Sequence, residues 1–177
     1  INLVGTADAE EYYSAGVDDF KSFADEVGAI FFKDNKLNSE MRINQLIESG
    51  AEVGVSINWP FLLGEKICRA LTFGILNGHA GDLPRYRGNA CPNWAILKGE
   101  EKIGLCVHVM EPNQLDSGPI ISRAYLENTN NTYIEDVYKW MDRKLPELFS
   151  ESINGLSSGS ITPTPQNSNP DFSLRCY

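Results

Sequence analysis

The chain lacks the residue combinations that mark metal-binding and disulfide-stabilised proteins. Its 177 residues include four cysteines and two histidines. The cysteines are too widely spaced for a CxxC pair and the histidines are far apart, so the sequence carries no zinc-binding pattern and we expect no metal. Cys68 and Cys106 lie in apolar runs and are interpreted as core residues. This usage favours a reducing compartment, and we predict a cytoplasmic protein.

Basic residues and long hydrophobic runs are also scarce. Fifteen lysines and arginines stand against 24 aspartates and glutamates, which gives a formal net charge of −9. Nucleic-acid binding depends on clustered cationic side chains, so a nucleic acid is not the expected partner, whereas one local cluster suffices for a small phosphorylated molecule. The sequence has no run as long as a membrane span and no basic leader, so we expect neither a membrane segment nor a secretory signal.

What the chain does contain is an alternation of short apolar runs and amphipathic segments. A Thr-x-x-Glu capping box, Thr132 to Glu135, is predicted to begin the last helix. The β-α-β-α-β rhythm predicts an α/β fold: a three-layer, Rossmann-like, mostly parallel sheet with flanking helices. Hydrophobic spacing predicts strands over 1–6, 28–32, 51–57 (buried throughout), 73–77, 104–110 and 119–126, and helices over 17–27, 39–49, 62–71, 90–97 and 132–153.

An amide and an imidazole stand two residues apart at the end of one predicted strand. Asn77 and His79 are separated by Gly78, and a loop rich in glycine and proline follows. Residues i and i+2 of a strand share a face, so both side chains can point into one pocket. In parallel sheets, sites form beyond the carboxyl ends of the strands, which is where this pair lies.

Four short motifs follow one another in order and at suitable separations. Together they resemble the folate-dependent formyltransferases, over about residues 1–153. That superfamily includes methionyl-tRNA, glycinamide ribonucleotide and sugar N-formyltransferases and formyltetrahydrofolate deformylase, and the sugar enzymes are the most similar in pattern. The motifs are Asn77-x-His79, Leu83-Pro84-Arg85-Tyr86-Arg87-Gly88, Gly104-Leu105-Cys106-Val107-His108 and Leu115-Asp116-Ser117-Gly118-Pro119-Ile120-Ile121.

The resemblance implies that Asn77, His79 and Asp116 form the catalytic trio. When an amine attacks a formyl carbon an oxyanion develops, and the Asn77 amide can donate to it; losing such a donor typically costs about 2.7–4 kcal/mol. His79 can support that oxygen or move the proton between the two nitrogens. Asp116 can fix the imidazole tautomer, stabilise its cation or hold a relaying water.

Each of these residues also has an ordinary structural interpretation. Asn77 could be a turn former that ends a strand, His79 a loop histidine with its hydrogen bonds satisfied, and Asp116 a plain turn residue. His108 alternates with Val107 and Val109 in a strand, so we favour a structural or site-lining role for it over a catalytic one.

The resemblance implies N10-formyltetrahydrofolate as the formyl donor. Its pterin would lie between the loop after the strand 51–57 and the loop that carries Asp116. Backbone groups there can bind a pterin edge and apolar side chains can form its walls, although Trp59 and Phe61 could equally pack in the core. The predicted folate-binding residues are Asn58, Trp59, Phe61, Leu62, Leu63, Gln114 and Leu115.

The acceptor is predicted to bind beside the loop 83–88. Arginine binds phosphate and carboxylate well because its guanidinium has forked donors, so Arg85 is a candidate for binding an anionic group of the acceptor. Arg87 is better explained as a structural residue that donates to backbone carbonyls of the loop. The predicted substrate-binding residues are Arg85, Tyr86, Asn89 and Trp94.

The predicted function is formyl transfer to a primary amine, with the amino group of a nucleotide-linked amino sugar as the favoured acceptor. Methionyl-tRNA formylation, formyltetrahydrofolate hydrolysis and a non-catalytic folate-binding module are the alternatives. Residues 1–154 are assigned to the catalytic domain, without the strand-helix unit with which family members usually begin. Residues 155–177 are assigned to a connector toward a carboxyl-terminal part through which the protein could form a homodimer.

Overall fold

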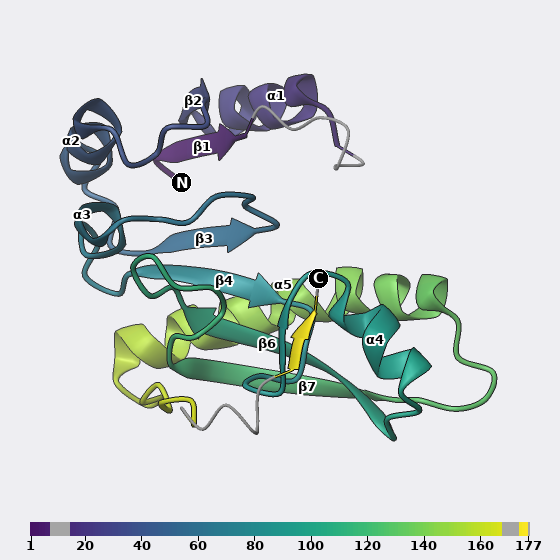
Figure 1. Cartoon of the computed structure of the whole chain (residues 1–177). Helices are drawn as coiled ribbons and strands as arrows, with labels where there is room; N and C mark the ends of the chain where they lie inside the picture. The colour runs from purple at the N-terminus through teal and green to yellow at the C-terminus, as the bar shows by residue number, and fades with distance from the viewer. Residues whose placement is uncertain (8–14, 168–173, 177) are drawn as a thin grey trace.

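The strands of the described chain form three separate groups (Figure 1). The computed structural model describes residues 1–7, 15–167 and 174–176. The central group is a four-stranded sheet in the order β3-β4-β6-β7, and the pairs β1-β2 and β5-β8 stand apart from it. The strands are β1 (Leu3–Thr6), β2 (Ile30–Lys33), β3 (Gly54–Ile57), β4 (Ile75–His79), β5 (Tyr86–Gly88), β6 (Lys102–Val109), β7 (Ile120–Glu127) and β8 (Leu174–Cys176).

Within the described residues, five helices connect and cover these strands. They are α1 (Val17–Val27), α2 (Glu40–Glu48), α3 (Glu65–Cys68), α4 (Cys91–Leu97) and α5 (Ile134–Ser158). The pairs β1-β2, β3-β4 and β5-β8 are parallel, whereas β4-β6 and β6-β7 are antiparallel. The predicted α/β class with a mostly parallel strand arrangement is confirmed.

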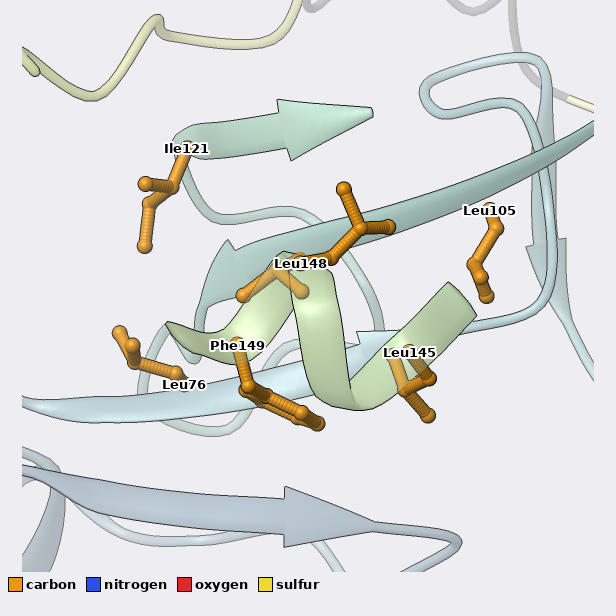
Figure 2. Packing of buried hydrophobic residues seen from close by; sticks show 7 residues of the cluster. Leu76, Leu105, Ile121, Leu145, Leu148 and Phe149 are labelled. Carbon is orange, nitrogen blue, oxygen red and sulfur yellow. The ribbon is translucent and has the colours of Figure 1, made fainter. Parts of the chain in front are cut away.

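The main hydrophobic core lies between α5 and the central sheet. Figure 2 shows Leu145, Leu148 and Phe149 of α5 beside Leu76 of β4 and strand residues of β6 and β7. Gly78 leaves room for this helix, because a Cβ atom there would lie 2.8 Å from Leu145 Cδ1. Leu76 and Gly78 therefore face α5, and the alternating residues Asn77 and His79 face away from it.

The prediction that residues 51–57 form a fully buried strand is wrong. Only Gly54–Ile57 are extended, and Val55 and Ile57 are each 52% exposed. β3 pairs with β4 on one side, and no described strand pairs with its other side. β1 and β2 are linked to the rest of the molecule around α2, where Asn2 Nδ2 donates to the Ser49 carbonyl.

The carboxyl-terminal third differs from prediction at both ends of α5. Thr132 does not begin α5: its Oγ1 accepts the Thr129 N–H at 2.8 Å, and Asp136 accepts the Tyr133 N–H where the helix starts. At the other end the helix runs to Ser158, past the expected domain boundary at 154. Gly155, in the last turns of α5, packs directly against Ile161, where a larger side chain would clash.

The short strands β5 and β8 were not predicted, and β8 lies in the expected connector. Residues 168–173 and 177 of that connector fall outside the described residues. Among the described helices, none combines the length and apolar character needed to cross a membrane.

Candidate active site

The antiparallel pairing of β4 with β6 brings the first polar groups of the site together. Asn77 lies opposite His108 in the register, and its Nδ2 is 3.1 Å from His108 Nε2. The Nδ1 of His108 lies 3.0 Å from the carbonyl oxygen of Val109. A carbonyl can only accept, so Nδ1 donates to it, while Nε2 faces the Asn77 amide. The amide of Asn77 keeps a second N–H for another acceptor.

Asp116 lies in the loop between β6 and β7. Its backbone is left-handed, with φ of 46°, a conformation that aspartate adopts in turns more readily than most non-glycine residues. Gly118 lets this turn close onto β6, because a Cβ atom there would lie 1.8 Å from the Val109 carbonyl oxygen. Tertiary contacts thus determine the position of Asp116.

The carboxylate of Asp116 lies between the two imidazoles. Its Oδ2 accepts the Gly88 backbone N–H at 2.9 Å and is 3.5 Å from His79 Nδ1. Its Oδ1 is 3.6 Å from His108 Nε2. The structure therefore brings the predicted trio Asn77, His79 and Asp116 into one cluster, with His108 as a fourth member.

His79 is held by a backbone carbonyl on its far side. Its Nε2 is 2.7 Å from the Tyr86 oxygen, so Nε2 donates and Nδ1 carries the lone pair of the neutral ring. Gly81 makes this approach possible, because a Cβ atom there would lie 2.6 Å from His79 Nε2. The Nδ1 of His79 is thus the ring nitrogen that can take up a proton, beside Asp116.

Burial and charge set the protonation of this cluster. Burial lowers the pKa of His79 below 6.5, more than the neighbouring Asp116 carboxylate raises it. For Asp116 burial opposes ionisation, but the contacts with His108, His79 and the Gly88 amide outweigh it and hold its pKa below 3.8. At neutral pH the arrangement is therefore an ionised carboxylate beside a neutral imidazole.

The two loops predicted to bind folate lie next to each other. The Asn113 N–H donates to the Leu63 carbonyl at 2.8 Å. Phe61, Leu62 and Leu115 present partly exposed apolar side chains. Trp59 Nε1 is buried without a hydrogen-bond partner among the described residues. An unsatisfied donor beside exposed apolar side chains fits a flat ligand with polar edges.

The remaining predicted folate-binding residues differ in their placement. Asn58 follows β3 with a left-handed φ of 54°. Gln114 is exposed and accepts the Ser117 hydroxyl at 3.1 Å. The Leu63 side chain is in the core with Ile67, so any ligand contact there would come from its backbone.

The predicted acceptor-binding residues are partly engaged elsewhere. Arg85 Nη1 donates to Glu100 Oε2 at 2.8 Å, and the Tyr86 hydroxyl donates to Glu100 Oε1 at 2.6 Å. Tyr86 is otherwise buried, whereas Asn89 and Trp94 are exposed. An acceptor that used Arg85 would have to replace its ion pair with Glu100, so these contacts stay predictions.

Two residues make contacts at the site that the sequence did not predict. His108 lies beside Asn77, where the favoured site-lining role would place it, but this contact depends on strand register. Gln166, in the expected connector, donates to the Asp116 carbonyl at 2.9 Å. No local pattern around Gln166 indicates this contact, because it joins residues 50 positions apart.

A cavity of about 550 Å³ lies elsewhere, between the end of β7 and the first half of α5. Its lining includes Glu127, Lys139 and Arg143 and none of the predicted site residues. Its charged groups largely neutralise one another, and Lys139 is already paired with Glu135. The cluster of Asn77, His79, His108 and Asp116 is therefore the stronger candidate for the active site.

Comparison with known proteins gives one family match. A family model described as "Formyl transferase" matches residues 7–153. The methionyl-tRNA formyltransferase of Pelobacter propionicus is 33% identical over 141 residues, covering 77% of this chain and 43% of the relative. That of Pseudoalteromonas translucida is 33% identical over 150 residues, covering 83% and 46%. The chain spans less than half the length of these relatives.

Solved structures share the fold at lower identity. Formyltransferase PseJ from Anoxybacillus kamchatkensis is 16% identical with a TM-score of 0.68, covering 99% of this chain and 85% of that one. Phosphoribosylglycinamide formyltransferase from Bacillus halodurans is 17% identical with a TM-score of 0.73, covering 90% and 82%.

Proposed function

Since this chain belongs to the formyl transferase family, whose model matches residues 7–153, we propose that it transfers a formyl group from N10-formyltetrahydrofolate to a primary amine. The observation that carries the proposal is the Asp116 carboxylate, 3.5 Å from His79 Nδ1 and 3.6 Å from His108 Nε2. Asn77 joins the same cluster through His108. These groups supply a hydrogen-bond donor and a proton acceptor at one place.

Each side chain has a distinct role in this proposal. The second N–H of Asn77 donates to the oxygen on which negative charge develops during attack by the amine. Neutral His79 takes up at Nδ1 the proton that the attacking amine loses, and the resulting cation is stabilised by Asp116 Oδ2. It returns this proton to the nitrogen that leaves when its bond to the formyl carbon breaks. Because its pKa is lowered, Asp116 stays ionised and can act this way at neutral pH.

The folate would be held by the two adjacent loops that Leu63 and Asn113 connect. When bound, it supplies the formyl group. Trp59 Nε1 offers an unused donor, and Phe61, Leu62 and Leu115 offer apolar contact area. Binding there would satisfy the buried N–H and cover exposed apolar surface, both of which favour complex formation.

A nucleotide-linked amino sugar is the acceptor we propose. The net charge of −9 disfavours a polyanionic partner. Several fold neighbours are sugar-related. PseJ was solved with UDP-4,6-dideoxy-4-formamido-L-AltNAc and tetrahydrofolate, and WlaRD, a sugar 3N-formyl transferase, with dTDP and 5-N-formyl-THF. The second candidate acceptor is methionyl-tRNA, which the names of the curated relatives favour.

An acceptor panel tests the reaction and separates the candidates. The chain is supplied with N10-formyltetrahydrofolate and, in parallel, UDP- and dTDP-linked amino sugars, methionyl-tRNA or no amine, and loss of the formyl group is followed. We expect turnover with an amino-sugar nucleotide. Turnover with methionyl-tRNA alone would select the second candidate, and formate release without amine would indicate a hydrolase. Folate binding without any turnover would indicate a binding module.

Single substitutions test the assignment of roles. We expect Asn77→Ala to lower kcat by about 10²–10³-fold, the range for losing an oxyanion donor. His79→Ala and Asp116→Ala should each lower it by about 10²–10⁴-fold, the range for losing general acid–base catalysis. Asn130→Ala, in an exposed loop, is the matched control and should retain full turnover. Near-complete transfer by any two of the three variants would disprove the assignment.

A further inference from the structure

The segment that follows α5 folds back onto the central sheet. Thr164 forms an isolated antiparallel bridge with Ile120 at the start of β7, through two backbone hydrogen bonds of 2.8 Å. Ile161 packs against Gly155 of α5. The chain is thus anchored on both the sheet and the helix just before Gln166.

The side-chain amide of Gln166 uses both of its polar ends. Its Nε2 donates to the carbonyl oxygens of Asp116 at 2.9 Å and Gly118 at 2.7 Å. Its Oε1 accepts from Arg87 Nη2 at 2.8 Å. Only one orientation of the amide satisfies all three contacts, because carbonyl oxygens cannot donate and a guanidinium cannot accept. Gln166 therefore connects the turn 116–118 to β5.

These contacts join the two segments that hold the acid–base pair. β5 provides the Gly88 N–H that Asp116 Oδ2 accepts and the Tyr86 carbonyl to which His79 donates. Asp116 lies in a turn with a left-handed backbone, and its contacts with Gly88 and Gln166 are to segments that are distant in the sequence. Its carboxylate is bound to β5, and its own carbonyl is bound to Gln166.

We propose that Gln166 is a positioning residue that fixes the Asp116 carboxylate relative to His79. The residue lies outside the part of the chain that the family model matches, 7–153. The inference deepens the proposed function and rests on it for the catalytic consequence, but the positioning itself can be measured without turnover. The Gly88 amide, which donates to Asp116, is the direct reporter.

Two substitutions separate the contacts of Gln166. Gln166→Met keeps the approximate shape and removes all three hydrogen bonds. Gln166→Glu keeps an acceptor for Arg87 but replaces the donors to the two carbonyls with a negative charge. Gln45→Glu is the matched control, because Gln45 also accepts from a guanidinium, Arg42 Nη1 at 2.7 Å, but lies on α2.

The measurement is amide hydrogen exchange of Gly88 by NMR in the full chain, together with kcat as a function of pH. We expect Gly88 exchange to rise at least tenfold in both Gln166 variants, with a loss of kcat of about tenfold and a displaced acid limb of the pH profile. Gln45→Glu should change none of these.

Three outcomes would overturn the proposal. Wild-type Gly88 exchange in both Gln166 variants would show that Asp116 does not depend on this residue. Loss of the dispersed amide spectrum in both would make Gln166 a stability residue only. Faster Gly88 exchange with an unchanged pH profile would remove its role in the reaction. An inactive wild-type chain would instead refute the proposed function and leave the exchange result to decide the positioning.

Discussion

At the scale of single residues, the buried acid–base pair links the stability of the protein to pH. Burial lowers the pKa of His79, and contacts with His108, His79 and Gly88 lower that of Asp116. A group with a lowered pKa stabilises the folded state above its unfolded pKa, and this contribution is lost as pH falls through the folded pKa. Lowering the pH therefore reduces the contribution of both groups to the stability of the folded protein.

We predict that the thermal midpoint falls as pH is lowered from about 7, the His79 contribution first declining below 6.5 and that of Asp116 only below 3.8. Each pKa unit of difference between the folded and unfolded states corresponds to about 1.4 kcal/mol. His79→Gln should flatten the profile just below pH 6.5. Thermal unfolding followed by circular dichroism at several pH values makes the comparison, and parallel profiles for both proteins would contradict the prediction.

Gly118 provides a second test at this scale. An alanine Cβ would lie 1.8 Å from the Val109 carbonyl, so Gly118→Ala must displace the turn that carries Asp116. We expect a loss of at least about 1–3 kcal/mol in the free energy of unfolding, the range for overpacking, measured by urea titration. Gly16→Ala is the control, because the nearest atom to its added Cβ is Asp19 Oδ2 at 3.8 Å.

At the scale of secondary-structure elements, the contact of α5 with the sheet carries the main core. Leu148 is 2% exposed within it. Leu148→Ala should lower the free energy of unfolding by about 2–5 kcal/mol, from lost burial plus the cavity left behind. Leu97→Ala, at a position that is 76% exposed, should change it by less than about 0.5 kcal/mol. Equal effects of the two in urea titration would refute this role of α5.

The accuracy of the sequence predictions also varied by element. The bounds of α1, Val17–Val27, were predicted to the residue, because its apolar spacing ends at Gly28, which takes the left-handed C-cap conformation. The start of α5 was missed because Thr132 bonds to Thr129 instead of capping the helix. β5 and β8 have three residues each, too few for a period to emerge, and their pairing is long-range.

Some features of the candidate site could likewise be predicted from the sequence, and others depend on contacts that only the fold creates. Asn77, His79 and Asp116 could be named because they lie in ordered motifs, and strand alternation placed the first two on one face. The contact of His108 with Asn77 required the β4–β6 register. The contacts of Gln166 with Arg87, Asp116 and Gly118 could not be predicted, because they depend on where the chain returns after α5. Neither residue spacing nor composition indicates that path.

At the scale of the whole molecule, the described residues of the segment β1–α1–β2 make few side-chain contacts with the rest of the structure. Arg42 of α2 pairs with Asp34 at 2.9 Å and covers the Phe32 ring at 4.6 Å. Within the segment α1 buries only Ala24, whereas six of the eight residues of β6 are buried. Local opening should therefore require less free energy in this segment than in the central sheet.

Hydrogen–deuterium exchange with mass spectrometry tests this difference. We predict that amides of Ile30–Lys33 exchange at least about 100-fold faster than those of Lys102–Val109, consistent with sub-global opening of the less buried unit. The β6 peptide serves as the internal reference. A single exchange rate shared by both strands would show that the molecule opens only as one unit.

The divided sheet has a further consequence for the molecule in concentrated solution. β1 and β3 run in the same direction (Figure 1), and each has a described strand partner on one side only. Their free sides present backbone donors and acceptors, and β3 adds the exposed side chains of Val55 and Ile57. Such edges are templates for an extended segment of another polypeptide. Self-association of this chain should therefore begin at β1 and β3 and increase with protein concentration.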